Sequence, residues 1–130
     1  MKPLAIWAPI VAAVFGLFAV VTSAANDTEQ VYVVVDSSFQ MRPVWSRVPD
    51  ELDRIDGRNR AEFALANERG PIHGYQSELT LVGVEPFAPC DLVGIDETPG
   101  AIAADERILI TVAGNGCDTD HLTGWKIIEL

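Results

Sequence analysis

Positive charge and cysteine are both scarce in this 130-residue chain. It contains 9 Lys and Arg residues against 19 Asp and Glu residues, and two Cys residues. A surface this acidic repels phosphate backbones and anionic lipid headgroups, so we expect neither nucleic-acid binding nor peripheral membrane binding. Basic partners or divalent cations suit the charge better, although an excess of acid also serves solubility alone.

Motifs of several enzyme classes are missing as well. The sequence has no Gly-x-Ser-x-Gly elbow, and the turn at residues 114–116 lacks the Lys and the following helix of a phosphate-binding loop. Two Cys residues together with His121 supply too few ligands for a zinc site, and no Cys-x-x-Cys spacing occurs. A hydrolase built from Ser37 or Ser38 with His73 is therefore the weakest functional hypothesis, and we predict a non-catalytic protein.

Charge of either sign is absent between Lys2 and Asp27. Residues 4–21 form an uncharged, mostly apolar stretch of 18 residues, long enough to span a membrane and longer than the usual core of a signal peptide. The small residues at 22–25 instead suit signal-peptide cleavage. Residues 1–25 are thus either a signal anchor or a signal peptide, and Lys2 favours an N-terminus inside the cell.

The remaining residues 26–130 have the length of one domain. We expect this domain to be exported to the periplasm or the cell surface, either anchored in the membrane or secreted. It carries 8 basic and 19 acidic residues, a net charge of −11, together with both cysteines, Cys90 and Cys117. Two thiols in an oxidising compartment are expected to pair, so we predict a Cys90–Cys117 disulfide.

The apolar run at residues 31–35 (VYVVV) is typical of a strand buried on both faces of a parallel sheet. Apolar residues then recur at spacings of three and four from Val44 to Ile55. This spacing predicts an amphipathic helix that is kinked at Pro49, or begins there, and ends at residues 56–57. Residues 61–66 are predicted to form a second strand, which completes a βαβ unit.

The rest of the chain predicts short elements. In order, they are a turn at 70–74, a third strand at 78–84, one helical turn near 101–104, a fourth strand at 107–112 and a last strand at 125–130. Strands that alternate with helical segments indicate an α/β fold. Because one good helix is present, we predict a small, mainly parallel, Rossmann-like sheet with thin cover, preceded by the N-terminal hydrophobic helix.

An acidic residue and two hydroxyls, Asp36, Ser37 and Ser38, directly follow the first predicted strand. Open α/β sheets bind ligands at the carboxyl ends of their strands, so this loop is the predicted location of a site. The pattern of apolar strand, Asp-x-Ser-x-x-Met and amphipathic helix resembles the opening of a von Willebrand factor type A domain. The resemblance implies a divalent cation, Mg²⁺ or Ca²⁺, bound by Asp36 and Ser38.

Two departures from the family's pattern make the implied metal site incomplete. Gln40 stands where the family has a second serine, and it is an additional candidate ligand. Residues 108–114 (ILITVAG) resemble a later strand of the family that ends in Thr-Asp-Gly, but Ala113 takes the place of the aspartate. Asp118 and Asp120, in the neighbouring loop, are the candidates to replace it.

Three interpretations of the loop stay open. It is a degenerate metal site, it has another polar role, or Asp36 caps the following turn, in which case Asp36→Ala costs about 1 kcal/mol of stability. The matching functions are a membrane-tethered, non-catalytic interaction domain for an unknown protein partner, a metal-dependent adhesion module, and a hydrolase. We favour the first, which needs no cofactor.

Overall fold

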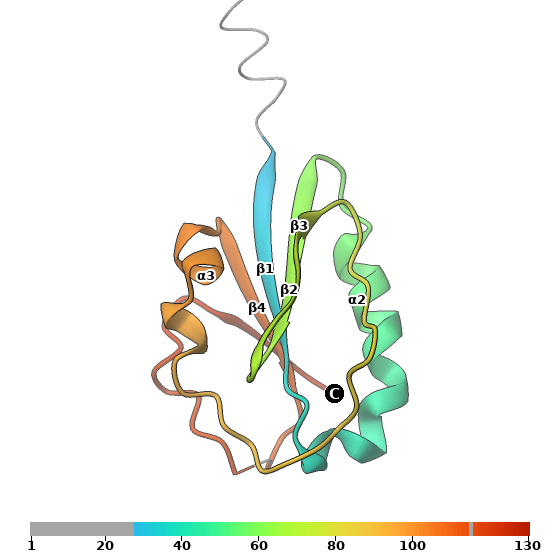
Figure 1. The fold of residues 1–130 in the computed structure, drawn as a ribbon, viewed down its shortest axis with the longest axis vertical. Coiled ribbons are helices and arrows are strands. Elements are labelled where there is room, and N and C mark those ends of the chain that lie inside the picture. The colour runs from blue at the N-terminus through green and yellow to red at the C-terminus, as the bar shows by residue number, and fades with distance from the viewer. Residues whose placement is uncertain (1–27, 115) are drawn as a thin grey trace, which may run out of the picture.

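A five-stranded, mostly parallel sheet organises the computed structural model, which describes residues 28–114 and 116–130 (Figure 1). The strands are β1 (Glu29–Val35), β2 (Ala61–Asn67), β3 (Gly70–Gln76), β4 (Glu106–Thr111) and β5 (Lys126–Glu129). Their order is β3-β2-β1-β4-β5; β1 is parallel to β2 and β4, β4 is parallel to β5, and β3 is antiparallel to β2. The predicted α/β class and mainly parallel sheet are confirmed.

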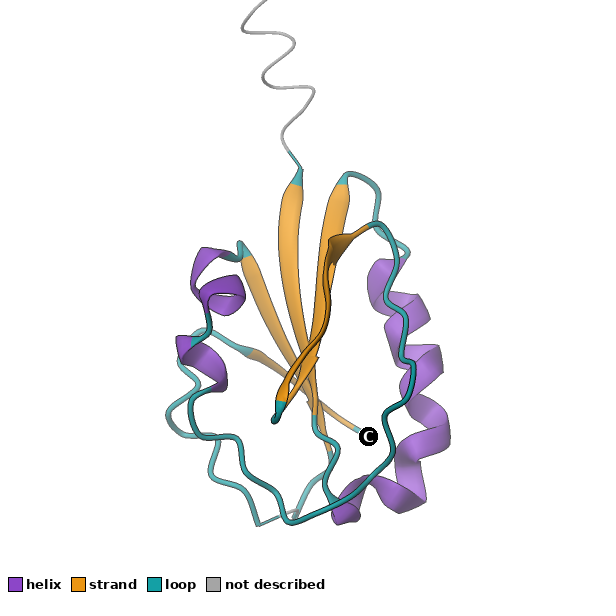
Figure 2. Ribbon diagram, in the orientation of Figure 1, coloured by secondary structure: helices purple, strands orange, loops and turns teal. Residues whose placement is uncertain are grey.

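Helical segments lie on both sides of the sheet (Figure 2). They are η1 (Phe39–Arg47), α2 (Val48–Asp56), η2 (Ile95–Glu97) and α3 (Pro99–Ala103). The first two follow one another without a break and form the one main helix. The other two are short and lie across the sheet from it.

The main helix changes its winding at the predicted proline. The α-helix α2 begins at Val48, with Pro49 in its first turn and the acidic Asp50 and Glu51 beside it. A proline loses no hydrogen bond at that position, and carboxylates interact favourably with the positive end of the helix dipole. The preceding turns are a 3-10 helix. The helix ends at Asp56, within the predicted boundary.

Strand β1 lies at the centre of the sheet and is buried on both faces, as its unbroken apolar run predicts. Val31, Val33 and Val35 belong to the core under α2, which includes Leu52 and Ile55. Tyr32 and Val34 belong to the opposite core, with Leu92, Ile95, Ala101, Leu109 and Leu122. Each fully buried aliphatic side chain contributes roughly 1.5–3 kcal/mol, so these two cores stabilise the fold.

The opposite core depends on a close approach of α3 to β1. A Cβ atom at Gly100 would lie 2.8 Å from Cε2 of Tyr32, so only glycine fits there without a shift of the ring. The Tyr75 hydroxyl donates a hydrogen bond to the Gly100 carbonyl oxygen at 2.8 Å. The helical turn predicted near 101–104 is thus present as α3, which begins at residue 99.

The predicted third strand is wrong. Residues 78–84 form no strand, and β3 occupies the residues predicted as a turn. The tight turn lies earlier, where the Asn67 side-chain oxygen accepts hydrogen bonds from the backbone N–H groups of Arg69 and Gly70 at 3.0 and 3.1 Å. Because β3 is an edge strand, it tolerates Pro71, whose ring nitrogen cannot donate a hydrogen bond.

The predicted signal anchor or signal peptide at residues 1–25 lies outside the described residues. Within residues 28–114 and 116–130, no helix combines the length and the apolar character needed to cross a membrane.

An ion-pair cluster joins three elements at the amino end of the central strands. Arg58, in the turn after α2, binds the Glu106 carboxylate through two guanidinium nitrogens, and its Nη1 lies 3.8 Å from Glu29. The hydrogen bond from Arg58 lowers the pKa of Glu106. The same bond raises the pKa of Arg58.

Arg58→Gln is expected to lower the free energy of unfolding by about 1 kcal/mol at pH 7, a modest amount because both side chains are partly exposed. A carboxyl group whose pKa is lowered in the folded state contributes stability above its unfolded pKa. That contribution is lost as the pH falls through the folded pKa, which lies below the ordinary pKa of a glutamate. Urea unfolding at pH 7 and pH 3 therefore gives a difference between variant and wild type at the higher pH alone. An equal difference at both values, or the same pH dependence in the exposed control Arg47→Gln, contradicts the pairing.

Candidate functional site

Asp36, Ser37 and Ser38 continue β1 beyond its carboxyl end, and none of them has exposed surface. The Asp36 N–H donates to the carbonyl oxygen of Ile110 at 2.9 Å, which extends the pairing of β1 with β4. The site predicted from the sequence is therefore at the expected edge of the sheet, but inside the protein rather than on its surface.

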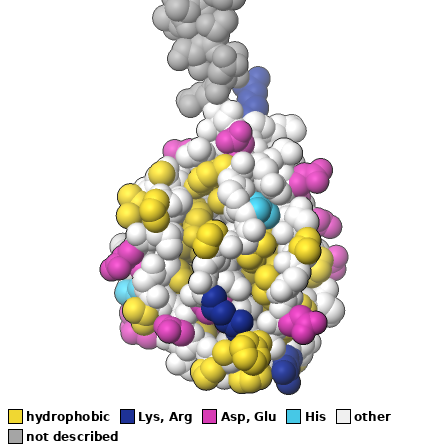
Figure 3. Space-filling model, viewed as in Figure 1, with side chains coloured by type: hydrophobic (Ala, Val, Ile, Leu, Met, Phe, Trp, Pro, Cys, Tyr) yellow, Lys and Arg dark blue, Asp and Glu magenta, His cyan; other side chains and the backbone are white. Residues whose placement is uncertain are grey.

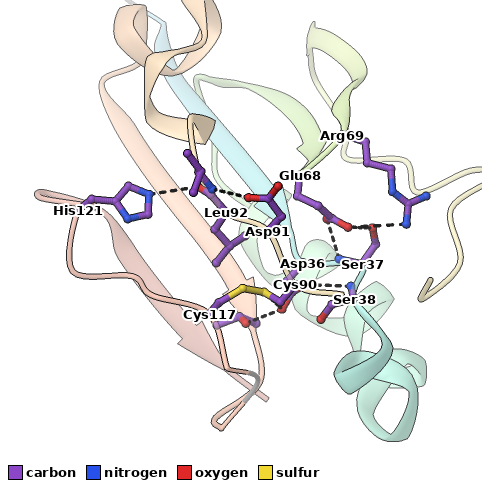
Figure 4. Close-up of a disulfide and its surroundings, with 12 residues drawn as sticks. Asp36, Ser37, Ser38, Glu68, Arg69, Cys90, Asp91, Leu92, Cys117 and His121 are labelled. Atoms are coloured by element: carbon purple, nitrogen blue, oxygen red, sulfur yellow. Dashed lines mark hydrogen bonds and ion pairs between the residues drawn. A yellow bond between two sulfur atoms is a disulfide. The ribbon is translucent and has the colours of Figure 1, made fainter. Parts of the chain in front are cut away.

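The Asp36 carboxylate joins its own loop to β4. Its Oδ1 accepts a hydrogen bond from the Ser38 N–H at 2.9 Å, as the capping interpretation predicts. Its Oδ2 accepts a hydrogen bond from the Thr111 hydroxyl at 2.8 Å, and the Cys90 Sγ lies 3.7 Å from that oxygen. The sulfur is part of a disulfide and carries no proton, so this last approach is a contact. Asp36 thus links two strand ends and touches the disulfide (Figure 4).

Glu68 is a member of this site that the sequence reasoning missed. It follows β2, and its side chain is 4% exposed. Its two carboxylate oxygens accept hydrogen bonds from the Ser37 N–H at 2.9 Å and from the Ser37 hydroxyl at 2.6 Å (Figure 4). The signal that identifies it is its place directly after the neighbouring parallel strand, because carboxyl ends of parallel strands meet at one edge.

A segment from the long loop before η2 covers these residues. The Phe87 N–H donates to the Ser37 carbonyl oxygen at 2.7 Å, and the Phe39 N–H donates to the Ala88 carbonyl oxygen at 3.0 Å. The predicted Cys90–Cys117 disulfide is present, with 5.7 Å between the two Cα atoms. These bonds hold the segment 87–90 across the Asp36 loop.

The other predicted metal ligands lie on the surface. Gln40, Asp118 and Asp120 are all exposed, and the Asp120 N–H donates to the Asp118 side chain at 2.8 Å. Ala113, also exposed, lies in the loop after β4. In the described part of the chain, no three His, Cys, Asp or Glu side chains are grouped so that they could hold a metal ion.

The geometry of Asp36 and Ser38 does not fit Mg²⁺ or Ca²⁺. These ions need six or more oxygen ligands, including waters, whereas both residues have no exposed surface and Asp36 already accepts two hydrogen bonds. One observation favours a ligand: among the described residues, Ser38 Oγ is the one buried side-chain oxygen or nitrogen without a hydrogen-bond partner. A single hydroxyl supplies one ligand, which is too few.

The serines and histidines do not assemble a catalytic centre. Ser37 and Ser38 have no exposed surface on which a substrate could approach. His73 lies on β3, where it contacts the Gly74 carbonyl oxygen through Nδ1 and accepts the Thr80 N–H through Nε2. His121 contacts the carbonyl oxygen of Leu92 instead.

Comparisons with protein-family models, with curated proteins and with solved structures find no match to this chain. The similarity to von Willebrand factor type A domains therefore remains an expectation that rests on the residues around Asp36.

Proposed function

We propose that residues 26–130 form an extracytoplasmic, non-catalytic interaction domain, tethered to a membrane by the N-terminal segment, which binds a protein partner without a metal ion. The observation that carries this proposal is the complete burial of Asp36, Ser37 and Ser38 beneath the disulfide-linked segment. A loop that is closed in this way holds strands together and does not offer ligands to solvent.

The disulfide supports the location of the domain. Disulfides persist in oxidising compartments and are rare in the cytosol. The strongly negative net charge supports solubility outside the cell and does not favour nucleic acid as a partner. A hydrolase needs an accessible nucleophile, and a metal-dependent adhesion module needs a complete metal shell. Binding to another protein needs neither.

Titration of the full chain in detergent micelles with Mg²⁺, Mn²⁺ and Ca²⁺ is expected to give no binding heat and no shift of the thermal unfolding midpoint. The reason is that the buried oxygens of Asp36 already accept hydrogen bonds within the protein. A saturable signal that disappears in Ser38→Ala, but persists in the surface control Asp53→Asn on α2, contradicts this expectation and favours the metal-dependent adhesion module.

Partner binding is tested separately in the native cells. A membrane-impermeant cross-linker is expected to join the tagged full chain to one discrete protein, because an exported domain is accessible to the reagent. Absence of any cross-linked product with both amine-reactive and carboxyl-reactive reagents would overturn the proposed function. Labelling that occurs only after cell lysis would overturn the proposed location.

A further inference from the structure

Two arginines and two phenylalanines stack at the surface beside the buried loop. The rings of Phe39 and Phe87 meet edge to face, with centroids 6.2 Å apart. The Arg42 guanidinium lies 4.9 Å from the centroid of Phe39, and the Arg69 guanidinium lies 4.7 Å from the centroid of Phe87. This row, which we call the Arg–Phe stack, combines cation–π and aromatic contacts.

The Arg–Phe stack borders a groove made of two adjoining hollows. One has a volume of about 570 Å³ and is lined by Arg42, Arg69 and the segment 83–87. The other, of about 360 Å³, lies between the first residues of β3 and the segment 82–84. Arg69 lines both hollows. The shared lining joins the two hollows into one groove.

Apolar side chains with unusual exposure accompany the groove. Phe39 is 43% exposed, Phe87 58% and Val82 70%. Figure 3 shows hydrophobic side chains beside Lys and Arg side chains at the end of the domain where the 36–39 and 85–90 segments lie in Figure 1. Exposed aromatic residues next to arginine are the composition that protein interfaces favour.

The local charge is opposite to that of the whole chain. The lining of the two hollows includes two guanidinium groups and one carboxylate, that of Glu85. Among the described residues, Arg42 donates one hydrogen bond, to the Pro86 carbonyl oxygen at 3.4 Å, and Arg69 donates to the Phe87 carbonyl oxygen. A guanidinium has five N–H donors, so most of those donors are available to a ligand.

Two arginines elsewhere on the domain are engaged differently. Arg54 pairs with Glu51, and Arg58 pairs with Glu106. Their charges are neutralised by close carboxylates, whereas the ion pair of Arg69 with Glu68 is longer, at 3.9 Å. Since Glu68 also binds Ser37, its charge is shared between the two. The groove is therefore a basic, apolar surface on an acidic protein.

The backbone beneath the groove is held in place before any partner arrives. The Phe87 N–H donates to the Ser37 carbonyl oxygen, and the Phe39 N–H donates to the Ala88 carbonyl oxygen. The disulfide at Cys90 anchors the same segment three residues after Phe87. A rigid site loses little conformational entropy on binding, which favours affinity. The buried loop thus supports the binding surface.

The position of the groove favours a protein over a membrane as its occupant. The groove adjoins the carboxyl end of β1, whereas the chain continues toward the N-terminal segment from the amino end of that strand (Figure 1). A seven-residue strand spans roughly 20 Å. In a domain tethered by its N-terminal segment, the groove lies at the opposite end of the strands from the tether.

We propose that this groove binds a peptide segment of a protein partner that carries carboxylates next to apolar side chains. The carboxylates bind the free N–H donors of Arg42 and Arg69, and the apolar side chains cover Phe87 and Val82. Charge screening over about 8 Å at physiological salt lets the two arginines act locally, despite the negative charge of the rest of the surface. The inference rests on the proposed function, since it names the partner class of that interaction domain.

The test measures binding of a short fluorescein-labelled peptide of Glu and Leu residues to the full chain in detergent micelles, by fluorescence anisotropy. The expected result is saturable binding that weakens at least tenfold in the Arg42→Gln/Arg69→Gln variant. A matched peptide with Lys in place of every Glu is expected to bind at least tenfold more weakly than the acidic one. Arg47→Gln, an exposed arginine of η1 outside the groove, controls for net charge and is expected to bind like wild type. Circular dichroism establishes that each variant is folded.

Equal affinities of the double variant and the wild type overturn the inference, as does equal binding of the two peptides. If the acidic peptide does not bind and short-chain phosphatidylglycerol binds saturably, the inference is overturned in favour of an anionic lipid surface. The cross-linking experiment distinguishes failure of the groove proposal from failure of the proposed function. A partner that is still captured by the double variant contradicts the groove and leaves the interaction domain in place, whereas absence of any partner for the wild type contradicts the proposed function itself.

Discussion

Cys90→Ala/Cys117→Ala is expected to lower the free energy of unfolding by roughly 3.5 kcal/mol, the chain-entropy estimate for a cross-link between residues 27 positions apart. Native domains have a total stability of about 5–15 kcal/mol, so this loss is a large fraction of it. The bridged segment depends on the cross-link, because in its described residues only η2, α3 and β4 are regular structure. Chemical denaturation of the oxidised wild type and of the variant measures the difference.

The reducing agent dithiothreitol supplies the control for this expectation. It should destabilise the wild type by a similar amount and leave the double variant unchanged, because the variant has no cysteine to reduce. A wild type whose stability does not respond to complete reduction, verified by thiol titration, contradicts a structural role for the bond. We further expect reduction to weaken peptide binding, since Cys90 anchors the segment that carries Phe87.

Asp36→Ala is expected to cost about 3 kcal/mol, well above the cost of losing an exposed cap. The substitution leaves the Ser38 N–H and the Thr111 hydroxyl in the interior without the acceptor that each has now. A buried donor that loses its partner costs roughly 1–3 kcal/mol. Asp36→Asn keeps one carbonyl oxygen and should cost less. Thermal and urea unfolding of the variants test this order.

Ser38→Ala is the matched control for the same loop. Within the described residues its hydroxyl has no hydrogen-bond partner, so its removal is expected to change stability by no more than about 0.5 kcal/mol, or to raise it. A cost of about 1 kcal/mol for Asp36→Ala would show that the carboxylate acts only as a local cap. A large cost for Ser38→Ala would show that the hydroxyl has a partner.

The predictions that hold are those that depend on local pattern. The run at 31–35 predicts a central strand because no polar residue interrupts it, and the apolar spacing around Pro49 predicts the helix because the helical period repeats in the sequence. The part of the 3-10 helix before Val44 was missed because residues 39–43 lack that period. The edge strand β3 was missed because its glycines and proline have the composition of a turn.

In the candidate site, too, the residue with a local sequence pattern was predicted and the residues brought together by long-range contacts were not. Asp36 was located from the sequence because it directly follows an apolar strand. Glu68 was not, since its bond to Ser37 joins residues 31 positions apart, and its place after β2 becomes informative only once β2 is paired with β1. The Arg–Phe stack was not predicted either. It brings Phe39 and Arg42 to Phe87, across more than forty residues of chain.

The sequence by itself determined the buried central strand, the main helix, the pairing of the two cysteines and the edge of the sheet where polar residues gather. These follow from residue type and short-range spacing. Only the tertiary structure decided that Asp36, Ser37 and Ser38 are enclosed and that arginines and phenylalanines form the surface above them. The reason is that enclosure depends on which distant segment crosses the loop, and here that segment is held by two backbone hydrogen bonds and a disulfide.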